Sequence, residues 1–315
     1  MMNSASANPV YTGREHWTAK NGVRLFLYEK RAVTLSRGPA TAANNLGTVL
    51  FVHGSSMASQ PTFDLQVPGR PYSSAMDFFA EHGFDTWCVD MEGYGRSGKT
   101  RDISCDIANG ADDLAAATDY IMKARGVKRF LVYGISSGAL RAALFAQRHP
   151  GRVARLALDA FVWTGAGSPT LEERRKKLPQ FLKMKRRPID KAFVRSIFER
   201  DHPGCAAENV VDAFADAVIA LDDSVPTGTY VDMCSKLPVV EPEKIPVPAL
   251  IMRGEFDGIA GFDDLAEFFK RLPNPDKQFA VMAGISHASF QQINYRLVYH
   301  ILHAFFSQPE PVYRG

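Results

Sequence analysis

Short apolar runs alternate with segments of helical periodicity along most of the chain. The near-continuous hydrophobic runs that we interpret as strands are residues 48–52, 85–90, 130–133 and 153–158. Residues 73–82 and 107–124 between them place apolar side chains at the three- and four-residue spacing of a helix. Strands that are apolar on both faces and alternate with helices are typical of a parallel sheet covered by helices on both sides. The pattern therefore predicts an α/β fold.

Both ends of the chain add elements to this sheet. Near the N-terminus, residues 17–20 and 23–28 flank Asn21-Gly22, a strong signal for a β-hairpin, and a polar loop follows up to Gly47. Toward the C-terminus the expected elements are a strand over 248–254, a helix over 262–272, a strand over 277–282 and a closing helix. We expect that last helix to bury the face formed by Leu297, Ile301, Ala304 and Phe305.

The strand rhythm is interrupted in the middle of the chain. Residues 161–244 are helical and charged, and prolines at 169, 179, 188, 203 and 226 divide them into short pieces. We predict a helical insertion that lies over the C-terminal edge of the sheet. The expected organisation is a core of residues 1–160 and 245–315 with a cap of residues 161–244.

Composition narrows the class of protein. The chain has 315 residues, 46% hydrophobic and 23% charged, which are ordinary globular values, and its net charge of +3 gives no case for nucleic-acid binding. The first seven residues lack the basic and apolar regions of a secretory signal, and no apolar run approaches the roughly 18 residues of a membrane span. The four cysteines have no paired spacing. We therefore expect a cytoplasmic protein with reduced thiols, no metal, no cofactor and no membrane partner.

A Gly-x-Ser-x-Gly sequence follows the predicted strand 130–133 and precedes a predicted helix over 139–146. A turn between strand and helix this tight favours glycine on both sides of the serine. It pushes the Ser136 hydroxyl outward as a candidate nucleophile. It also aims the backbone N–H of Ser137, at a helix N-terminus, toward an anion forming beside that hydroxyl.

A serine nucleophile needs a base and an acid that orients the base. His287 follows the last predicted strand on a glycine-containing loop and is the candidate base, whereas His53 is expected to hydrogen-bond locally and shape its own loop. Asp257 follows the penultimate strand and is the first choice as the orienting acid. Asp159 and Glu255 remain open as alternatives.

The remaining site residues come from loops beside these strand ends. Ser55, after His53-Gly54, is expected to give the second oxyanion N–H, with Ser56 as the alternative. Phe161, Trp163 and Met57 are expected to line the substrate pocket.

The predicted cap carries two basic stretches. Residues 172–177 read Glu-Glu-Arg-Arg-Lys-Lys, and residues 183–187 read Lys-Met-Lys-Arg-Arg. We interpret the basic residues as the solvated face of a helix whose inner face is Leu178, Phe181 and Leu182. The alternative is a basic surface that attracts an anionic substrate or a membrane.

Four segments in the right order resemble the α/β-hydrolase superfamily. They are His-Gly-Ser-Ser at 53–56, Asp-Met-Glu-Gly-Tyr-Gly-Arg-Ser at 90–97, the serine turn at 134–138, and Asp257 with the loop 284–287. The resemblance implies an eight-stranded, mostly parallel sheet with a helical cap after the sixth strand. It also implies a structural role for the 90–97 turn.

The departures from relatives in that superfamily bear on the reaction. Epoxide hydrolases and haloalkane dehalogenases carry aspartate where this chain has Ser136, so both are disfavoured. Carbon–carbon hydrolases typically have an aromatic residue where this chain has Ala288. The loop 57–65 is similar to a bacterial subgroup that includes hydrolases of phthalate monoesters.

We therefore expect a serine hydrolase that cleaves a small carboxylic ester, a small-molecule partner, through an acyl-enzyme on Ser136. A carbon–carbon hydrolase of a ring-cleavage product and a ligand-sensing binding module remain as alternatives. The sequence does not indicate the oligomeric state.

Overall fold

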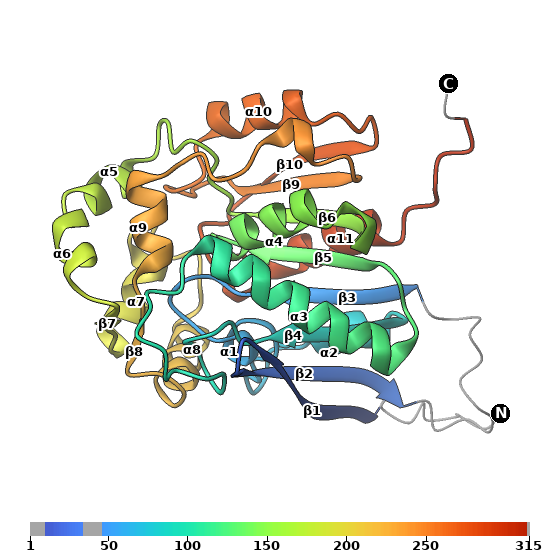
Figure 1. Ribbon diagram of the computed structural model, residues 1–315, viewed down its shortest axis with the longest axis horizontal. Helices are drawn as coiled ribbons and strands as arrows, with labels where there is room; N and C mark the ends of the chain where they lie inside the picture. The colour runs from blue at the N-terminus through green and yellow to red at the C-terminus, as the bar shows by residue number, and fades with distance from the viewer. Residues whose placement is uncertain (1–9, 34–45, 314–315) are drawn as a thin grey trace.

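The computed structural model describes residues 10–33 and 46–313, and its centre is a single large sheet (Figure 1). Within those residues the strands form an eight-stranded sheet. In spatial order its strands are β1 (Val10–Lys20), β2 (Val23–Val33), β4 (Phe84–Val89), β3 (Gly47–Val52), β5 (Phe130–Ile135), β6 (Val153–Asp159), β9 (Ala249–Gly254) and β10 (Lys277–Met282). The polar loop predicted before Gly47 lies, for residues 34–45, outside the described residues.

Strand β2 runs in the opposite direction to the other seven strands of the sheet. β1 and β2 are antiparallel to each other and β2 is antiparallel to β4, whereas all pairs from β4 to β10 are parallel. The predicted hairpin is confirmed, because Asn21 and Gly22 both have positive φ, as the tight turn joining two twisted strands requires. The expected α/β fold with a mostly parallel eight-stranded sheet is therefore confirmed.

Helices cover both faces of the sheet. On one face lie α3 (Ile107–Arg125), α4 (Ser137–Arg148) and α10 (Phe262–Arg271), and on the other lie α2 (Ala75–Glu81) and α11 (Tyr295–Phe306). A short helix α1 (Ser59–Phe63) follows β3. Strand β3 shows why both faces are apolar: Leu50 and Val52 belong to the first core, whereas Val49 and Phe51 belong to the second. The near-continuous hydrophobic runs thus reflect burial on both sides.

Local signals set the ends of the predicted helices. Asp106 caps α3 by accepting a hydrogen bond from the backbone N–H of Asn109, and Gly126 ends the helix in the left-handed conformation. Ser74 caps α2 in the same way through the N–H of Asp77. These helices therefore begin and end within about two residues of their predicted positions.

The buried face of α11 differs from the prediction. Leu297 and Ile301 are only partly buried and Ala304 is exposed, and of the predicted face only Phe305 is fully buried. The buried residues are Tyr295, Val298, Tyr299, Leu302, Phe305 and Phe306. The helix is turned because its two tyrosines pack inward: Tyr299 stacks on Phe78 with ring centroids 4.7 Å apart, and its hydroxyl donates to the carbonyl oxygen of Tyr72. Burying the two large aromatic rings, with their hydroxyl groups hydrogen-bonded, stabilises the fold more than burying the smaller aliphatic side chains would.

The segment between β6 and β9 forms a separate group of helices at the end of the sheet where the parallel strands terminate (Figure 1). Its elements are α5 (Pro169–Arg175), α6 (Leu178–Lys183), α7 (Lys191–Glu199), α8 (Glu208–Ile219), α9 (Gly228–Ser235) and a small antiparallel ladder of β7 (Arg186–Pro188) and β8 (Ser224–Pro226). Prolines 169 and 179 lie in the first turns of α5 and α6, where a missing N–H is tolerated.

Two details of this segment differ from the sequence interpretation. The β7–β8 ladder was not predicted, because each strand has only three residues and gives no periodic signal. Leu182, expected on the inner face of its helix, is 64% exposed, whereas Phe181 is buried. α6 is a single short helix, so only one side of one turn reaches the interior. Among the described residues, no helix has both the length and the apolar character needed to cross a membrane.

Candidate active site

The turn between β5 and α4 holds Ser136 in a strained conformation. Ser136 has φ 58° and ψ −126°, which is rare for a residue with a side chain. A Cβ atom on Gly134 would lie 2.5 Å from the carbonyl oxygen of Gly138, so the turn closes only with glycine at its first position. The Ser136 N–H donates to the carbonyl oxygen of Asp159 at 2.9 Å, which ties the turn to the neighbouring strand β6.

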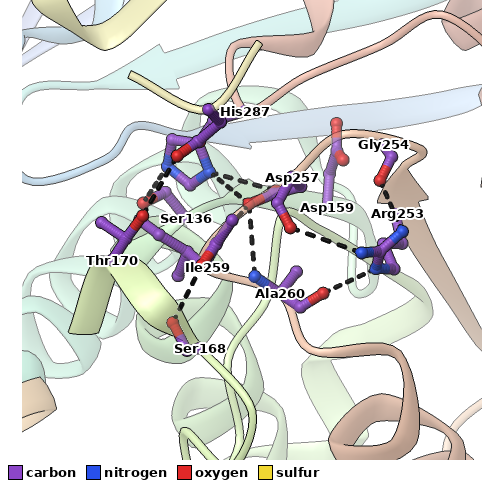
Figure 2. Close-up of polar contacts among 12 residues, drawn as sticks. Ser136, Asp159, Ser168, Thr170, Arg253, Gly254, Asp257, Ile259, Ala260 and His287 are labelled. Atoms are coloured by element: carbon purple, nitrogen blue, oxygen red, sulfur yellow. Dashed lines mark hydrogen bonds and ion pairs between the residues drawn. The ribbon is translucent and has the colours of Figure 1, made fainter. Parts of the chain in front are cut away.

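The structure brings Ser136, His287 and Asp257 together (Figure 2). His287 Nε2 lies 3.0 Å from Ser136 Oγ, and His287 Nδ1 lies 3.1 Å from each carboxylate oxygen of Asp257. Because the carboxylate can only accept, Nδ1 carries the proton and Nε2 is left to accept the hydrogen bond of the Ser136 hydroxyl. This arrangement can take a proton from the serine.

Backbone amides hold Asp257 in its ionised form. Its Oδ1 accepts hydrogen bonds from the N–H groups of Ile259 at 2.8 Å and Ala260 at 3.2 Å. Burial alone would raise the pKa of Asp257, but the interaction with His287 and these two amides lower it to about 2. Arg253 fixes the loop by donating to the carbonyl oxygens of Gly254 and Ala260 (Figure 2). The carboxylate is therefore charged and immobile beside the imidazole.

The two alternative acids make other contacts. Asp159 is fully buried and accepts a hydrogen bond of 2.6 Å from the Tyr133 hydroxyl, and burial raises its pKa to about 7. Glu255 accepts from the N–H of Gly284 at 2.8 Å and so braces the loop that leads to His287. Of the three candidate acids, Asp257 is the one hydrogen-bonded to the imidazole.

His53 shapes its loop, as its place before Gly54 indicated. Its Nδ1 lies 2.7 Å from the carbonyl oxygen of Gly54, and its Nε2 accepts from the N–H of Met91 at 3.0 Å. Burial and the nearby charge of Arg141 lower its pKa to about 3, so the ring is neutral. Arg141 also donates to the carbonyl oxygen of His53. Both ring nitrogens are engaged in this local structure, away from Ser136.

The candidate oxyanion donors flank Ser136 from two sides. Ser137 is the first residue of α4, where a backbone N–H has no partner within the helix. Ser55 follows Gly54, and a Cβ on Gly54 would lie 3.5 Å from Cβ of Ser136, so this loop passes directly beside the serine. Ser55 is held in place because its carbonyl oxygen accepts from the Tyr94 hydroxyl. Ser56 instead uses its side chain to contact Tyr230 of α9 and Arg187 of β7.

The turn at residues 90–97 is structural. Buried Asp90 accepts hydrogen bonds from the N–H and hydroxyl of Ser59 and from the N–H of Arg96. A Cβ on Gly95 would lie 2.2 Å from a carboxylate oxygen of Asp90, which explains the glycine at this position. The turn therefore fixes the start of α1, close behind the Ser55 loop.

A cavity opens above Ser136 and His287. Its apolar wall is formed by Met57, Ile135, Ile197, Phe214 and Ala288. Met57 thus lies where the sequence predicted it, but Phe161 and Trp163 do not line this cavity. They pack against Phe268 of α10, with ring centroids 4.8 and 5.8 Å away, and the Trp163 indole N–H donates to the carbonyl oxygen of Val240. Phe161 and Trp163 were predicted to line the pocket, but the structure places them in the core.

Polar residues that the sequence interpretation missed line the same cavity. They are Thr62, Arg174, Arg200, Tyr230 and Gln291. Arg174 belongs to the basic stretch that we expected to be solvated, but its guanidinium turns inward and stacks over Tyr230 with Cζ 4.5 Å from the ring centroid. The sequence held one indication of this inward orientation. Arg174 follows buried Leu171 by three residues, which places both side chains on one face of the helix. The neighbouring Arg175, Lys176 and Lys177 are exposed, as expected.

Three possible metal ligands also meet here. Within the described residues, Asp201, Asp257 and His287 offer ligand atoms that all lie within 4.8 Å of one another. Each already has a protein partner: Asp201 is held by Arg200 and Thr170, while Asp257 and His287 are bonded to each other. These partners account for the cluster as a hydrogen-bonded network.

The fold is that of the α/β hydrolases, with serine, aspartate and histidine following three different strands in the order 136, 257, 287. The chain belongs to the family described as serine aminopeptidase, S33, whose model matches residues 44–293. It is therefore a hydrolase. No curated protein matches the chain.

Solved structures share this fold at low sequence identity. A thermophilic esterase from Thermogutta terrifontis has 17% identity and a TM-score of 0.65, with 93% of this chain and 97% of that chain covered. A serine hydrolase from the polyaromatic-hydrocarbon-degrading bacterium Cycloclasticus zankles has 15% identity and a TM-score of 0.67, with 94% and 98% covered. A putative lipase from Acinetobacter baumannii has 17% identity and a TM-score of 0.67, with 93% and 90% covered. At these identities the likeness shows the fold.

Proposed function

We propose that the protein is a serine hydrolase that cleaves a small carboxylic ester through an acyl-enzyme on Ser136. The observation that carries this proposal is the chain of short contacts from Ser136 Oγ to His287 Nε2 and from His287 Nδ1 to Asp257. A nucleophile hydrogen-bonded to a base that is oriented by an acid is the arrangement that acyl transfer needs.

The reaction follows from these positions. Ser136 Oγ attacks the ester carbonyl carbon while His287 Nε2 takes the hydroxyl proton, and Asp257 stabilises the imidazolium that forms. The carbonyl oxygen becomes an oxyanion that accepts hydrogen bonds from the N–H groups of Ser137 and Ser55. Collapse breaks the ester C–O bond, and the imidazolium gives its proton to the departing alcohol. Water then attacks the acyl group with His287 as base, which releases the acid and restores Ser136.

The helices between β6 and β9 act in this proposal as a cap, formed by residues 161–244, that roofs the pocket. Four of them each contribute a lining residue: Arg174 from α5, Ile197 from α7, Phe214 from α8 and Tyr230 from α9. A roof built from separate helices lets substrate selection change without disturbing the catalytic residues, which all come from the sheet end.

Two observations support an ester as the substrate: the similar solved structures and the lining of the pocket. The matched solved structures include an esterase and a putative lipase. The pocket wall is mostly apolar beside the serine, which suits an organic acyl or alcohol group. Neither the family match nor these neighbours favour a carbon–carbon hydrolase or a ligand-sensing module.

Trapping the acyl-enzyme tests the proposal. The protein is mixed with 4-nitrophenyl acetate, quenched in acid within the first turnover and digested, and the peptides are analysed by mass spectrometry. We expect an added acetyl group on Ser136 and none in the Ser136→Ala variant. Acetylation confined to another residue, or unchanged turnover by the variant, would contradict the proposal.

A further inference from the structure

Two arginines from the cap converge on one tyrosine at the roof of the pocket. Arg174 Cζ lies 4.5 Å and Arg187 Cζ lies 4.4 Å from the centre of the Tyr230 ring. Arg187 also donates a hydrogen bond of 2.7 Å to Ser56 Oγ, which in turn lies 3.3 Å from the Tyr230 hydroxyl. Because Arg174, Tyr230 and Ser56 line the same cavity as Ser136, this arginine pair, Arg174 and Arg187, faces that cavity, Arg174 directly and Arg187 through Ser56.

Among the residues that the structure describes, no carboxylate forms an ion pair with either member of the arginine pair. Arg187 is 6% exposed, and buried nitrogen atoms of both side chains, Arg174 Nη1 and Arg187 Nε, have no hydrogen-bond partner among the described residues. Two acids of the catalytic region are engaged with other partners: Asp201 forms two hydrogen bonds of 2.9 Å with Arg200, and Asp257 is bonded to His287. Removing a cation from water without a counter-charge is costly, so a site of this kind favours an anion.

Tyr230 compensates this charge only in part. Burial would raise the pKa of its hydroxyl, but Arg174, Arg187 and the hydrogen bond with Ser56 lower it to about 7. Even a fully ionised tyrosine supplies one negative charge against two guanidinium groups. Positive charge therefore remains at the roof of the pocket.

We propose that the arginine pair binds a carboxylate carried by the substrate, so that the enzyme prefers esters with a second, ionised carboxyl group, such as half-esters of dicarboxylic acids. This inference rests on the proposed function of Ser136. Arg174 supplies the direct contact from the cavity wall, and Arg187, which holds Ser56 Oγ, adds its positive charge beside it. The apolar wall takes the rest of the molecule while the ester lies at Ser136.

A matched pair of substrates tests the preference. 4-Nitrophenyl hydrogen glutarate and 4-nitrophenyl pentanoate have acyl chains of equal length and differ in a terminal carboxylate. We expect wild type to have the higher kcat/KM for the glutarate ester. In Arg174→Gln the ratio of the two kcat/KM values should fall by roughly 10- to 100-fold, the range for losing a charge-assisted hydrogen bond. Arg174→Lys should restore part of it. The exposed neighbour Arg175, changed to Gln, is the matched control and should leave the ratio unchanged.

A second substrate pair locates the carboxylate. 4-Acetoxybenzoate and phenyl acetate differ in a carboxylate on the alcohol part, and the same ratio is measured for them. An Arg174-dependent preference in either pair supports the inference and tells whether the acyl or the alcohol group meets the arginines. If Arg174→Gln alters the ratio in neither pair while Ser136-dependent turnover persists, the inference is wrong and the proposed function stands.

Binding without catalysis separates the two failures. Calorimetry measures glutarate binding to the Ser136→Ala protein and to the Ser136→Ala protein that also carries Arg174→Gln. We expect the second Kd to be at least 10-fold weaker. Equal Kd values, or no glutarate binding to either protein, would overturn the carboxylate site even if no ester is turned over. A difference in Kd without acylation of Ser136 would instead overturn the proposed function alone.

Discussion

A Cβ atom on Gly138 would lie 2.3 Å from the carbonyl oxygen of Val52. The first turn of α4 therefore rests directly on the end of β3, the strand that leads into the Gly54 loop. The same contact sets the separation between the N-terminus of α4 and the Ser55 backbone. The two candidate oxyanion donors, Ser55 and Ser137, thus owe their spacing to one glycine.

We expect Gly138→Ala to lower the free energy of unfolding by about 2 to 3 kcal/mol, because backbone atoms that cannot rotate away must shift to admit the methyl group. Urea unfolding measures the change. Gly151→Ala is the matched control, since its Cβ would meet no atom within 4 Å. Equal stability of the two variants would show that the contact between α4 and β3 can relax.

Replacing the two adjacent serines should have opposite consequences. Ser136→Ala removes the proposed nucleophile and should reduce kcat by about 10⁵- to 10⁶-fold. Ser137→Ala keeps the backbone N–H and removes only a buried hydroxyl that has no hydrogen-bond partner among the described residues, so most activity should remain. A fluorophosphonate probe should label wild type and Ser137→Ala but not Ser136→Ala. Labelling of all three would place the nucleophile elsewhere.

The acids at 257 and 159 should differ in catalysis. Asp257→Asn should lower kcat by about 10⁴-fold, because an amide can donate to Nδ1 and so favours the tautomer whose proton sits on Nε2. Asp159→Asn should retain most of the wild-type rate, since Asp159 bonds to Tyr133 and not to the imidazole. Ester hydrolysis at pH 7.5 compares them, and the reverse ranking would assign the orienting role to Asp159.

Asp159 should instead make stability depend on pH. Its folded pKa of about 7 lies above its ordinary value of 3.8, because of burial. Between these values the folded state keeps a proton that the unfolded chain has lost, so stability falls as pH rises through this window and is level above it. The stability of Asp159→Asn relative to wild type should therefore improve by roughly 2 to 4 kcal/mol from pH 4 to pH 7. Urea unfolding across this range measures it, and a difference independent of pH would refute the shift.

Features that depend on neighbours in the chain were predictable from the sequence. The hairpin turn at Asn21-Gly22 needs only two residues that accept positive φ, and the serine turn needs only glycines around Ser136 between a strand and a helix. Parallel strands end at one edge of the sheet, so the placement of His287 and Asp257 near Ser136 followed from the order of the strands.

The sequence alone did not determine which of three acids contacts the imidazole of His287. Asp159 is the last residue of β6, and Glu255 and Asp257 follow β9, which ends at the same edge of the sheet. Which carboxylate meets the imidazole depends on side-chain directions and on the amides of Ile259 and Ala260, which point at Asp257 only once the loop is folded. The sequence could rank these acids. The acid that contacts the imidazole is identified by the hydrogen bond between Asp257 and His287, which are 30 residues apart in the chain.

The sequence by itself determined the strands, the helices flanking them and the candidate chemistry at Ser136, because these follow from local periodicity and local backbone geometry. Only the tertiary structure decided what surrounds the substrate. Phe161 and Trp163 pack in the core against Phe268. Arg174 points inward and contacts Tyr230, which is 56 residues later in the chain. The physical reason is that packing between distant elements sets which side chains face a cavity. The sequence of a short amphipathic helix does not indicate which element it will pack against.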